Sequence, residues 1–327
     1  MSETLLELKD LSVRYTTDGI ISRAVNHVNL KLNKGEVLGL VGETGAGKTT
    51  TALSLLSLLP KYTSEVEGEI LFQGKDLLKL DEKEIRKIRG RHISMIFQDP
   101  MTSLNPVFRI GEQIADVIRI HNEGIHPQEV SDRVDSILSM VGIPTSRKRE
   151  FPHQFSGGMK QRVMIAIAIA CNPDLLIADE PTTALDVTIQ AQVIKMMRNL
   201  QRELHSSVIL ITHDLGIVAN FCDKVAIMYA GEIIEYGTLE EIFDKSRPHH
   251  PYTKGLFGSI PNINEKTDRL HPIFGLTPHP SELPSGCKFH PRCPQCMEVC
   301  KEGNVPVYYE GDYKCQCWLL AGKEAAV

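Results

Sequence analysis

The hydrophobic pattern of the first 245 residues alternates between short apolar runs and stretches of helical period. Residues 5–15 alternate loosely, which predicts a strand, and Val37–Gly42 is a short apolar run followed by a glycine-rich stretch and a helical pattern that reaches residue 59. Further short strands are predicted at 68–72, 93–97, 175–178, 208–211 and 225–228. Strands that alternate with helices favour an α/β core with a largely parallel sheet.

Two regions depart from this pattern. From about 104 to 170, apolar residues such as Ile110, Ile114 and Ile118 recur at helical spacing and predict a helical subdomain. Beyond residue 246 apolar periodicity is scarce, and ten of the 18 prolines fall in the last 80 residues. We therefore expect an α/β domain over 1–246 and an extension over 247–327 that forms little regular structure and buries little apolar surface.

Composition and charge narrow the classes of function. The 327 residues include 36 Lys and Arg against 41 Asp and Glu, a net charge of −5, which argues against a dedicated nucleic-acid-binding protein. The purest apolar run, Val163–Cys171, is far shorter than the roughly 20 residues that a membrane-spanning helix needs. The N-terminus carries acidic residues where a signal peptide needs basic ones. We expect a cytosolic protein that reaches a membrane only through a partner.

A phosphate-binding motif lies in the glycine-rich stretch. The pattern G-x-x-x-x-G-K-[ST], and the helix start after it, are formed by Gly42, Glu43, Thr44, Gly45, Ala46, Gly47, Lys48, Thr49 and Thr50. Glycines let the backbone turn its N–H groups toward phosphates, and the helix directs its positive end at the same oxygens. Lys48 would neutralise the β- and γ-phosphates, and the Thr49 hydroxyl would ligate Mg²⁺. The alternative is a glycine-rich turn with an exposed lysine.

A pair of acids follows the predicted strand at 175–178. Asp179 and Glu180 emerge where that apolar run ends, and a phosphate loop needs such an acidic element on a neighbouring strand. Asp179 would hold the Mg²⁺ shell, and Glu180 could polarise an attacking water. Two adjacent acids at a strand end could also be an ordinary turn.

The stretch Phe155–Arg162, with Ser156, Gly157 and Gly158, resembles the signature motif of the ATP-binding-cassette (ABC) ATPases, although Met159 stands where many members have Gln. Other elements of that family are matched in order along residues 1 to about 245: an adenine-stacking aromatic at Tyr15, a glutamine loop at Gln98, an aspartate loop at Ala184-Leu185-Asp186 and a switch histidine at His213. The resemblance implies an ABC-type P-loop NTPase core with a helical subdomain and a Pro/Cys-rich C-terminal extension.

The resemblance also implies roles for these residues. Ser156, Gly157 and Gly158 would contact phosphate, and Tyr15 would stack on adenine. Gln98 would reach Mg²⁺ and report the nucleotide state to a membrane partner, and His213 would contact the γ-phosphate and the attacking water. Each could also be structural: a strand aromatic, a surface amide or a hydrogen-bonded histidine. In this family one subunit's signature covers the other's phosphate loop, so a second ATPase subunit is implied, in a homodimer or a heterodimer.

Four stretches are similar to the dipeptide/oligopeptide branch of ABC importers: Phe97–Pro106, Glu180–Gln192, His250–Thr253 and Gly286–Pro294. The branch implies two transmembrane permease subunits, an extracytoplasmic solute-binding protein acting indirectly, no nucleic acid, and a peripheral location on the cytoplasmic face of the cell membrane. Nickel importers share the branch and are one alternative. A soluble ABC ATPase of DNA repair or translation is another, which a single cassette and a neutral tail disfavour.

Six of the eight cysteines lie in the last 41 residues. In a cytosolic chain such clustering indicates metal binding rather than disulfides, and four thiolates can hold Zn²⁺ or an iron–sulfur cluster; the spacing alone does not choose. The resemblance to peptide-importer ATPases implies a 4Fe–4S cluster on Cys287, Cys293, Cys300 and Cys315, which leaves Cys296 and Cys317 spare. Zn²⁺ and unliganded thiols remain the alternatives.

Overall fold

The computed structural model of the chain describes residues 3–99, 103–183, 185–259 and 272–321. The chain divides into two compact units. Unit 1 contains Asn33–Val37 and Lys79–Ile211, and unit 2 contains Thr4–Leu32, Leu38–Leu78 and Thr212–Val327. The division at residue 246 stays a prediction about sequence regions, because strands on both sides of it lie in unit 2.

A parallel sheet forms the centre of unit 1. Its strands run in the order β8 (Ser207–Thr212), β7 (Leu175–Asp179) and β6 (Ile93–Ile96), with β7 paired in parallel to both neighbours. Every residue of β7 and β8 is buried. Continuous apolar runs of this kind are typical of parallel strands that are covered on both faces, so the three strands lie where the sequence predicts them.

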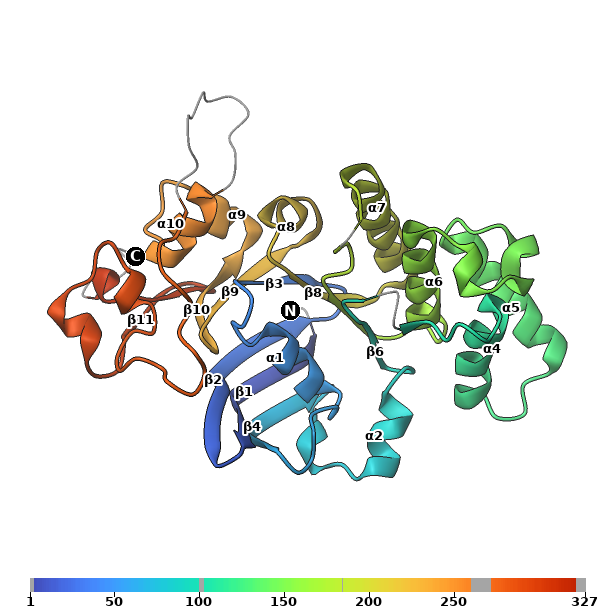
Figure 1. Ribbon diagram of the computed structural model, residues 1–327, viewed down its shortest axis with the longest axis horizontal. Helices are drawn as coiled ribbons and strands as arrows, with labels where there is room; N and C mark the ends of the chain where they lie inside the picture. The colour runs from blue at the N-terminus through green and yellow to red at the C-terminus, as the bar shows by residue number, and fades with distance from the viewer. Residues whose placement is uncertain (1–2, 100–102, 184, 260–271, 322–327) are drawn as a thin grey trace. The chain divides into compact units, whose positions relative to one another are not determined.

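The helical part of unit 1 confirms the predicted insert. Helices α4 (Ile110–His121), α5 (Pro127–Met140) and α6 (Gly157–Ile169) contact one another and appear as the green group in Figure 1. Their periodic apolar residues, such as Ile114 and Val134, are buried. Helix α2 (Glu82–Ile88) precedes β6, and α7 (Val187–Leu204) follows β7.

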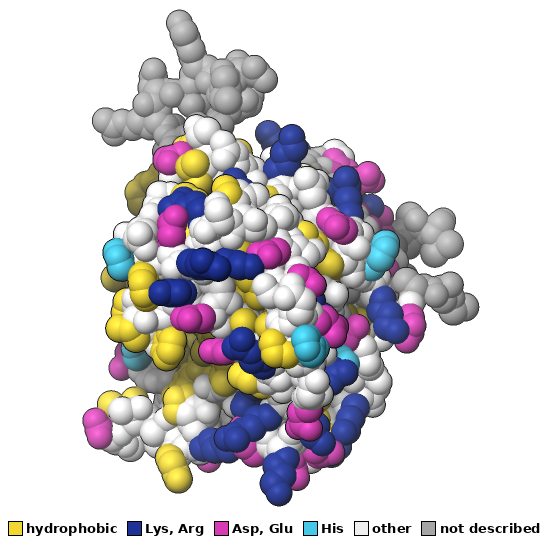
Figure 2. All heavy atoms as spheres, turned by 90° about the vertical axis from the view of Figure 1, so that its right-hand side faces the viewer, with side chains coloured by type: hydrophobic (Ala, Val, Ile, Leu, Met, Phe, Trp, Pro, Cys, Tyr) yellow, Lys and Arg dark blue, Asp and Glu magenta, His cyan; other side chains and the backbone are white. Residues whose placement is uncertain are grey.

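The outer face of these helices is solvated. Figure 2 shows Lys and Arg side chains interspersed with Asp and Glu on the face drawn there. Ion pairs one turn apart, Arg119 with Asp116 on α4 and Arg133 with Glu129 on α5, belong to this helical surface. Exposed pairs of this kind contribute little to stability, about 0–1 kcal/mol each.

Unit 2 contains two sheets. One has the order β2 (Ile20–Asn33), β1 (Thr4–Thr17), β4 (Ser64–Phe72) and β5 (Lys75–Asp76), with β4 antiparallel to both β1 and β5; Figure 1 shows β2, β1 and β4 side by side. The other runs in the order β11 (Val307–Glu310), β12 (Tyr313–Gln316), β10 (Glu232–Thr238), β9 (Lys224–Tyr229) and β3 (Val37–Val41). Only the β3–β9 pair of this second set is parallel, so the sheet is less uniformly parallel than predicted.

The helices of unit 2 are short. Helix α1 (Lys48–Leu55) follows the glycine-rich loop where the sequence predicts a helix, and α8 (Leu215–Phe221) follows β8. Helix α9 (Leu239–Phe243) begins at an N-cap threonine, Thr238, and α10 (Pro251–Gly258) belongs to the extension. Among the described helices, none combines the length and the hydrophobicity that crossing a bilayer requires.

The expectation for the extension was wrong in part, because its described residues do bury apolar side chains. Tyr252 and Tyr313 are fully buried and Phe289 is 2% exposed. The rings of Tyr252 and Phe289 pack beside Tyr229 of β9, with ring centroids 4.7 Å apart for Tyr229–Tyr252 and 5.2 Å apart for Tyr229–Phe289, while the Tyr313 ring packs against His249. Aromatic side chains bury large areas each, so a few of them make a core without any helical or strand periodicity.

Candidate active site

The phosphate loop of unit 2 needs its glycines for two different reasons. Gly47 has φ 101° at the N-cap of α1, a backbone conformation that residues other than glycine rarely adopt. At Gly42 the backbone is ordinary, but an added Cβ would lie 2.2 Å from the Met228 carbonyl oxygen of β9. The loop therefore turns into α1 while it passes tightly against the neighbouring strand.

Lys48 is folded back onto this loop. Its side chain is buried, and Nζ donates to the Gly42 carbonyl at 2.7 Å and to the Glu43 carbonyl at 2.9 Å. The ammonium group is thus held directly over the carbonyls at the start of the loop. An ammonium in this place suits a phosphate, with which its hydrogen bonds are charge-assisted.

Glu43 is held by residues of the extension for which the sequence predicted no role at the phosphate loop. Its carboxylate accepts from both Nη atoms of Arg292, at 2.6 and 3.0 Å, and from the Thr277 hydroxyl at 3.1 Å. Its backbone N–H donates to the Tyr252 hydroxyl at 2.9 Å. The Glu43 hydrogen bond with Arg292 raises the pKa of that guanidinium above its usual value. The extension therefore contributes directly to the phosphate loop.

The acidic pair of unit 1 lies at the end of β7. Asp179 is 3% exposed, and Glu180 adopts φ 45°, a left-handed conformation that costs a residue with a side chain about 1–3 kcal/mol. Glu180 Oε2 accepts from Gln98 Nε2 and from the Thr183 hydroxyl, both at 2.9 Å. The structure thus brings the predicted glutamine and the predicted catalytic carboxylate together.

The signature residues start helix α6 in unit 1. Ser156 is the N-cap of α6, and its side chain makes no capping hydrogen bond to the helix. A Cβ at Gly158 would lie 2.6 Å from Ile189 Cγ2 of α7, so glycine permits the close approach of these two helices. Asp186 caps α7 by accepting from the Ile189 N–H at 2.9 Å, whereas Ala184 of the predicted aspartate loop lies outside the described residues.

The remaining predicted residues are in unit 2. His213 is exposed directly after β8, and its neighbour Asp214 caps α8 by accepting from the Gly216 N–H at 2.7 Å. Tyr15 is half-buried on β1, opposite Ser64 of β4. Tyr15, His213 and the phosphate loop therefore belong to unit 2, while the other predicted nucleotide residues belong to unit 1.

The metal site predicted at the cysteines of the extension stays a prediction. Among the described residues no group of three or more His, Cys, Asp or Glu side chains is arranged to hold a metal ion. Burial raises the pKa of Cys287 to about 12, and the neighbouring thiols Cys317, Cys300 and Cys293 raise it too. Cys315 is instead beside Glu235 and Tyr313, and its pKa is raised first by burial and then by the Glu235 charge.

Two family descriptions match the chain. The family described as ABC transporter matches residues 25–183, and the family described as oligopeptide/dipeptide transporter, C-terminal region, matches residues 234–300. The dipeptide transport ATP-binding protein DppD of Bacillus subtilis is 48% identical over 97% of this chain and 95% of its own length. The oligopeptide transport ATP-binding protein OppD of Haemophilus influenzae is 48% identical over 98% of each chain.

Solved structures of other ATP-binding cassettes have a fold similar to that of this chain. A post-hydrolysis dimer of the ATP-binding cassette MJ0796, bound to ADP and phosphate, matches with a TM-score of 0.65 and 28% identity, over 72% of this chain and 99% of that one. The cbiO1 protein of Clostridium perfringens, part of an ABC transporter complex, matches with a TM-score of 0.65 and 30% identity, over 75% of this chain and 92% of that one.

Proposed function

This chain belongs to the ABC transporter ATPases, in the branch that contains the dipeptide and oligopeptide transport ATP-binding proteins, and we propose that it powers peptide uptake through a membrane importer. It is an ATPase. The observation that carries the proposal is that one chain combines an ABC cassette at 25–183 with the C-terminal region of peptide transporters at 234–300.

ATP hydrolysis is assigned to the phosphate loop, the glutamine loop and the acidic pair. The N–H groups from Gly45 to Thr50 and the Lys48 ammonium bind the phosphates, and Tyr15 stacks on the adenine. Mg²⁺, when bound, neutralises charge on the phosphate oxygens; Thr49, Gln98 and Asp179 are the residues that would hold it. Glu180 orients and polarises the attacking water, and its hydrogen bonds from Gln98 and Thr183 fix the carboxylate for that role.

A second ATPase subunit completes the site. One chain has one phosphate loop and one signature, and Ser156 with the N–H groups of Gly157 and Gly158 at the start of α6 suits the phosphate of a nucleotide held by another subunit. The dimeric post-hydrolysis structure of MJ0796 supports this arrangement. The subunit composition of the purified complex distinguishes a copy of this chain from a related ATPase as the partner.

The membrane subunits would dock beside the glutamine loop. Phe97, Val107 and Phe108 of unit 1 are 43%, 73% and 48% exposed. Large exposed apolar side chains of this kind are suited to a protein interface. The chain would then be peripheral, on the cytoplasmic face of the membrane, with two permease subunits above it and a solute-binding protein delivering peptide on the far side.

The cysteines of the extension are proposed as ligands of a 4Fe–4S cluster, with Zn²⁺ as the alternative. We favour Cys287, Cys293, Cys300 and Cys317 as the ligand set, because Cys315 lies opposite the buried Glu235 in the β10–β12 pair, and that carboxylate disfavours a second negative charge beside it. Burial raises the pKa of Cys317 to about 11, so binding a metal there would release protons. Binding the cluster would require the cysteine side chains to move closer together than they are in the described residues.

Reconstitution tests the proposal. The chain is assembled with its permease subunits, partner ATPase and binding protein in vesicles, and ATP-dependent uptake of a labelled dipeptide and of Ni²⁺ is measured side by side. Uptake of peptide supports the proposal, and uptake of Ni²⁺ without peptide would replace it with nickel import. ATP hydrolysis with no permease-dependent uptake of either solute would point to the soluble alternative.

A further inference from the structure

One part of the extension that contacts the phosphate loop is the turn Gly286–Pro294. This turn carries Cys287 and Cys293, and Arg292 lies directly before the second of them. The turn is held by backbone hydrogen bonds from the Cys287 N–H to the Cys300 carbonyl and from the Arg292 N–H to the Phe289 carbonyl. Arg292 is thus presented from a fixed part of the backbone.

The guanidinium of Arg292 is enclosed as well as paired. Its side chain is 5% exposed, against 29% for Glu43. It lies 5.8 Å from the centre of the Tyr229 ring and 5.9 Å from that of Phe289, and Nη1 also donates to the Tyr229 hydroxyl at 3.3 Å. A bidentate pair that is largely out of water fixes both direction and distance between its two partners.

From these contacts we infer that Arg292 is a positioning residue for ATP binding. It fixes the Glu43 carboxylate, and the carbonyl of the same residue accepts from Lys48 Nζ at 2.9 Å. The path from the extension to the phosphate-binding ammonium therefore has two contacts. The Tyr252 hydroxyl, which accepts from the Glu43 N–H, holds the same residue from the other side of its backbone.

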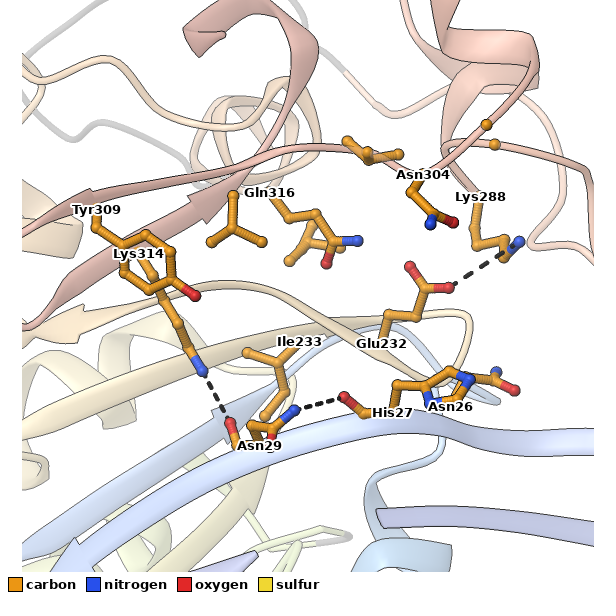
Figure 3. Close-up of a pocket in the computed structure, with 15 residues that line it drawn as sticks. Asn26, His27, Asn29, Glu232, Ile233, Lys288, Asn304, Tyr309, Lys314 and Gln316 are labelled. Carbon is orange, nitrogen blue, oxygen red and sulfur yellow. Dashed lines mark hydrogen bonds and ion pairs between the residues drawn. The ribbon is translucent and has the colours of Figure 1, made fainter. Parts of the chain in front are cut away.

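The other side of the same turn supplies an internal comparison. Lys288 Nζ lies 4.0 Å from the Glu232 carboxylate of β10 and donates to the Pro284 carbonyl at 2.8 Å. Figure 3 shows this ion pair at one end of a polar pocket whose lining also includes Asn304 and Gln316. Lys288 thus anchors the turn without touching the phosphate loop.

The inference rests on the proposed function only in that ATP is the ligand, and a substitution series tests it. Arg292→Met, Arg292→Lys, Glu43→Gln and the double variant Arg292→Met/Glu43→Gln are compared with wild type, with Lys288→Met as the matched control. The dissociation constant of a fluorescent ATP analogue and the KM and kcat for ATP are measured in the assembled transporter. Hydrogen bonds between charged groups of this kind correspond to a change of about 10- to 100-fold.

Four results are expected, one for each of four variants. Arg292→Met weakens nucleotide binding and raises KM by about 10- to 100-fold while kcat at saturating ATP stays within about twofold, since the pair acts before chemistry. Arg292→Lys falls in between, because lysine cannot make the two-pronged contact. The double variant is no worse than the weaker-binding single variant, and Lys288→Met keeps wild-type affinity.

Other results would overturn the inference that Arg292 positions the phosphate loop. If Arg292→Met lowers thermal stability as Lys288→Met does but leaves nucleotide affinity unchanged, the residue is merely structural. If the Arg292 and Glu43 effects add, Glu43 acts on nucleotide by itself. Should Arg292→Met not fold, Glu43→Gln still decides, since unchanged affinity in it overturns the inference. If the wild-type protein showed no ATPase activity, that result would instead count against the proposed function.

Reciprocity gives a readout that is independent of turnover. If the turn stabilises bound nucleotide, nucleotide must stabilise the turn by the same free energy. Hydrogen exchange of peptides from residues 286–294 should slow when a non-hydrolysable ATP analogue is added to wild type, and should not respond in Arg292→Met. Equal exchange in wild type with and without nucleotide would contradict the coupling.

Discussion

The buried carboxylate of Glu235 is expected to stabilise the packing of the extension more than any exposed ion pair does. It is 0% exposed on β10 and accepts from four donors: His249 Nδ1, the His250 N–H, the Thr253 hydroxyl and the Tyr313 hydroxyl. The His249 Nε2 meets the Asp244 carbonyl at 2.8 Å. Both ring nitrogens therefore face acceptors, which favours the charged imidazolium.

The substitution Glu235→Gln removes the charge and places an amide among donors. Breaking a buried ion pair by changing one partner costs about 3–5 kcal/mol, whereas an exposed pair contributes about 0–1 kcal/mol. Glu298→Gln is the matched control, because Glu298 makes a salt bridge with Lys301 in the same extension and its side chain is 91% exposed. We expect the free energy of unfolding to fall by about 3–5 kcal/mol in Glu235→Gln and by less than about 1 kcal/mol in Glu298→Gln.

The sign of the pH dependence follows from His249. Burial lowers its pKa, but the hydrogen bond and charge of Glu235 and the Asp244 carbonyl raise it, and the pKa ends above its ordinary value of 6.5. A raised pKa in the folded state means that the contribution is complete below about pH 6.5 and is lost as pH rises through the folded-state value. The difference in unfolding free energy between wild type and Glu235→Gln should therefore be largest below about pH 6.5 and shrink as the pH rises above it.

The assay uses Trp318, the single tryptophan of the chain, which lies in the extension next to Cys317. Its fluorescence during urea unfolding reports the free energy of unfolding of this part of unit 2, at each pH and for each variant. A Glu235→Gln loss below about 1 kcal/mol near pH 6, or a loss that grows with pH, would refute the reasoning.

Four further outcomes are expected. Glu180→Gln should bind ATP within about twofold of wild type while phosphate release falls by about 100-fold or more, and retained turnover would mean that another group activates water. Lys48→Ala should weaken nucleotide binding by about tenfold or more, measured by titration, and unchanged affinity would remove its phosphate role. Gly42→Ala should lose nucleotide binding but keep its circular dichroism spectrum, because a Cβ there meets a carbonyl oxygen at 2.2 Å; wild-type affinity would show that the loop adapts. In anaerobically purified protein Cys317→Ser should lose bound iron or zinc and Cys315→Ser should keep it, and the reverse pattern would restore the set first predicted from the sequence.

Much of the fold and of the nucleotide motifs could be predicted because their signals are local. The phosphate loop is a contiguous pattern between a strand and a helix, and Asp179 and Glu180 follow directly on a buried strand. Strand β2 was missed although Val28, Leu30 and Leu32 alternate with polar residues and are buried. That alternation is the signal that could have found it.

The extension was harder because its contacts join residues far apart in the chain. Arg292 meets Glu43 across 249 positions, and no spacing rule links the two. The choice between Cys315 and Cys317 depends on the position of Glu235 on a different strand, which the sequence does not reveal. Scarce periodicity does not imply scarce burial in the extension, because Tyr252 and Tyr313 are buried there as single large side chains.

The pairing of β12 with β10 has a consequence for shortened versions of the protein. Glu235 and Tyr236 of β10 lie opposite Cys315 and Lys314, so the last hairpin covers the outer margin of that sheet. A chain truncated after residue 246 would leave the backbone groups of β10 unpaired along that margin, together with the apolar surface that the aromatic rings had covered. An unpaired edge strand can pair with other chains and so promote aggregation. If the truncated chain is insoluble, the cause would therefore be the loss of β12 beside β10 and not a defect in the ATPase residues.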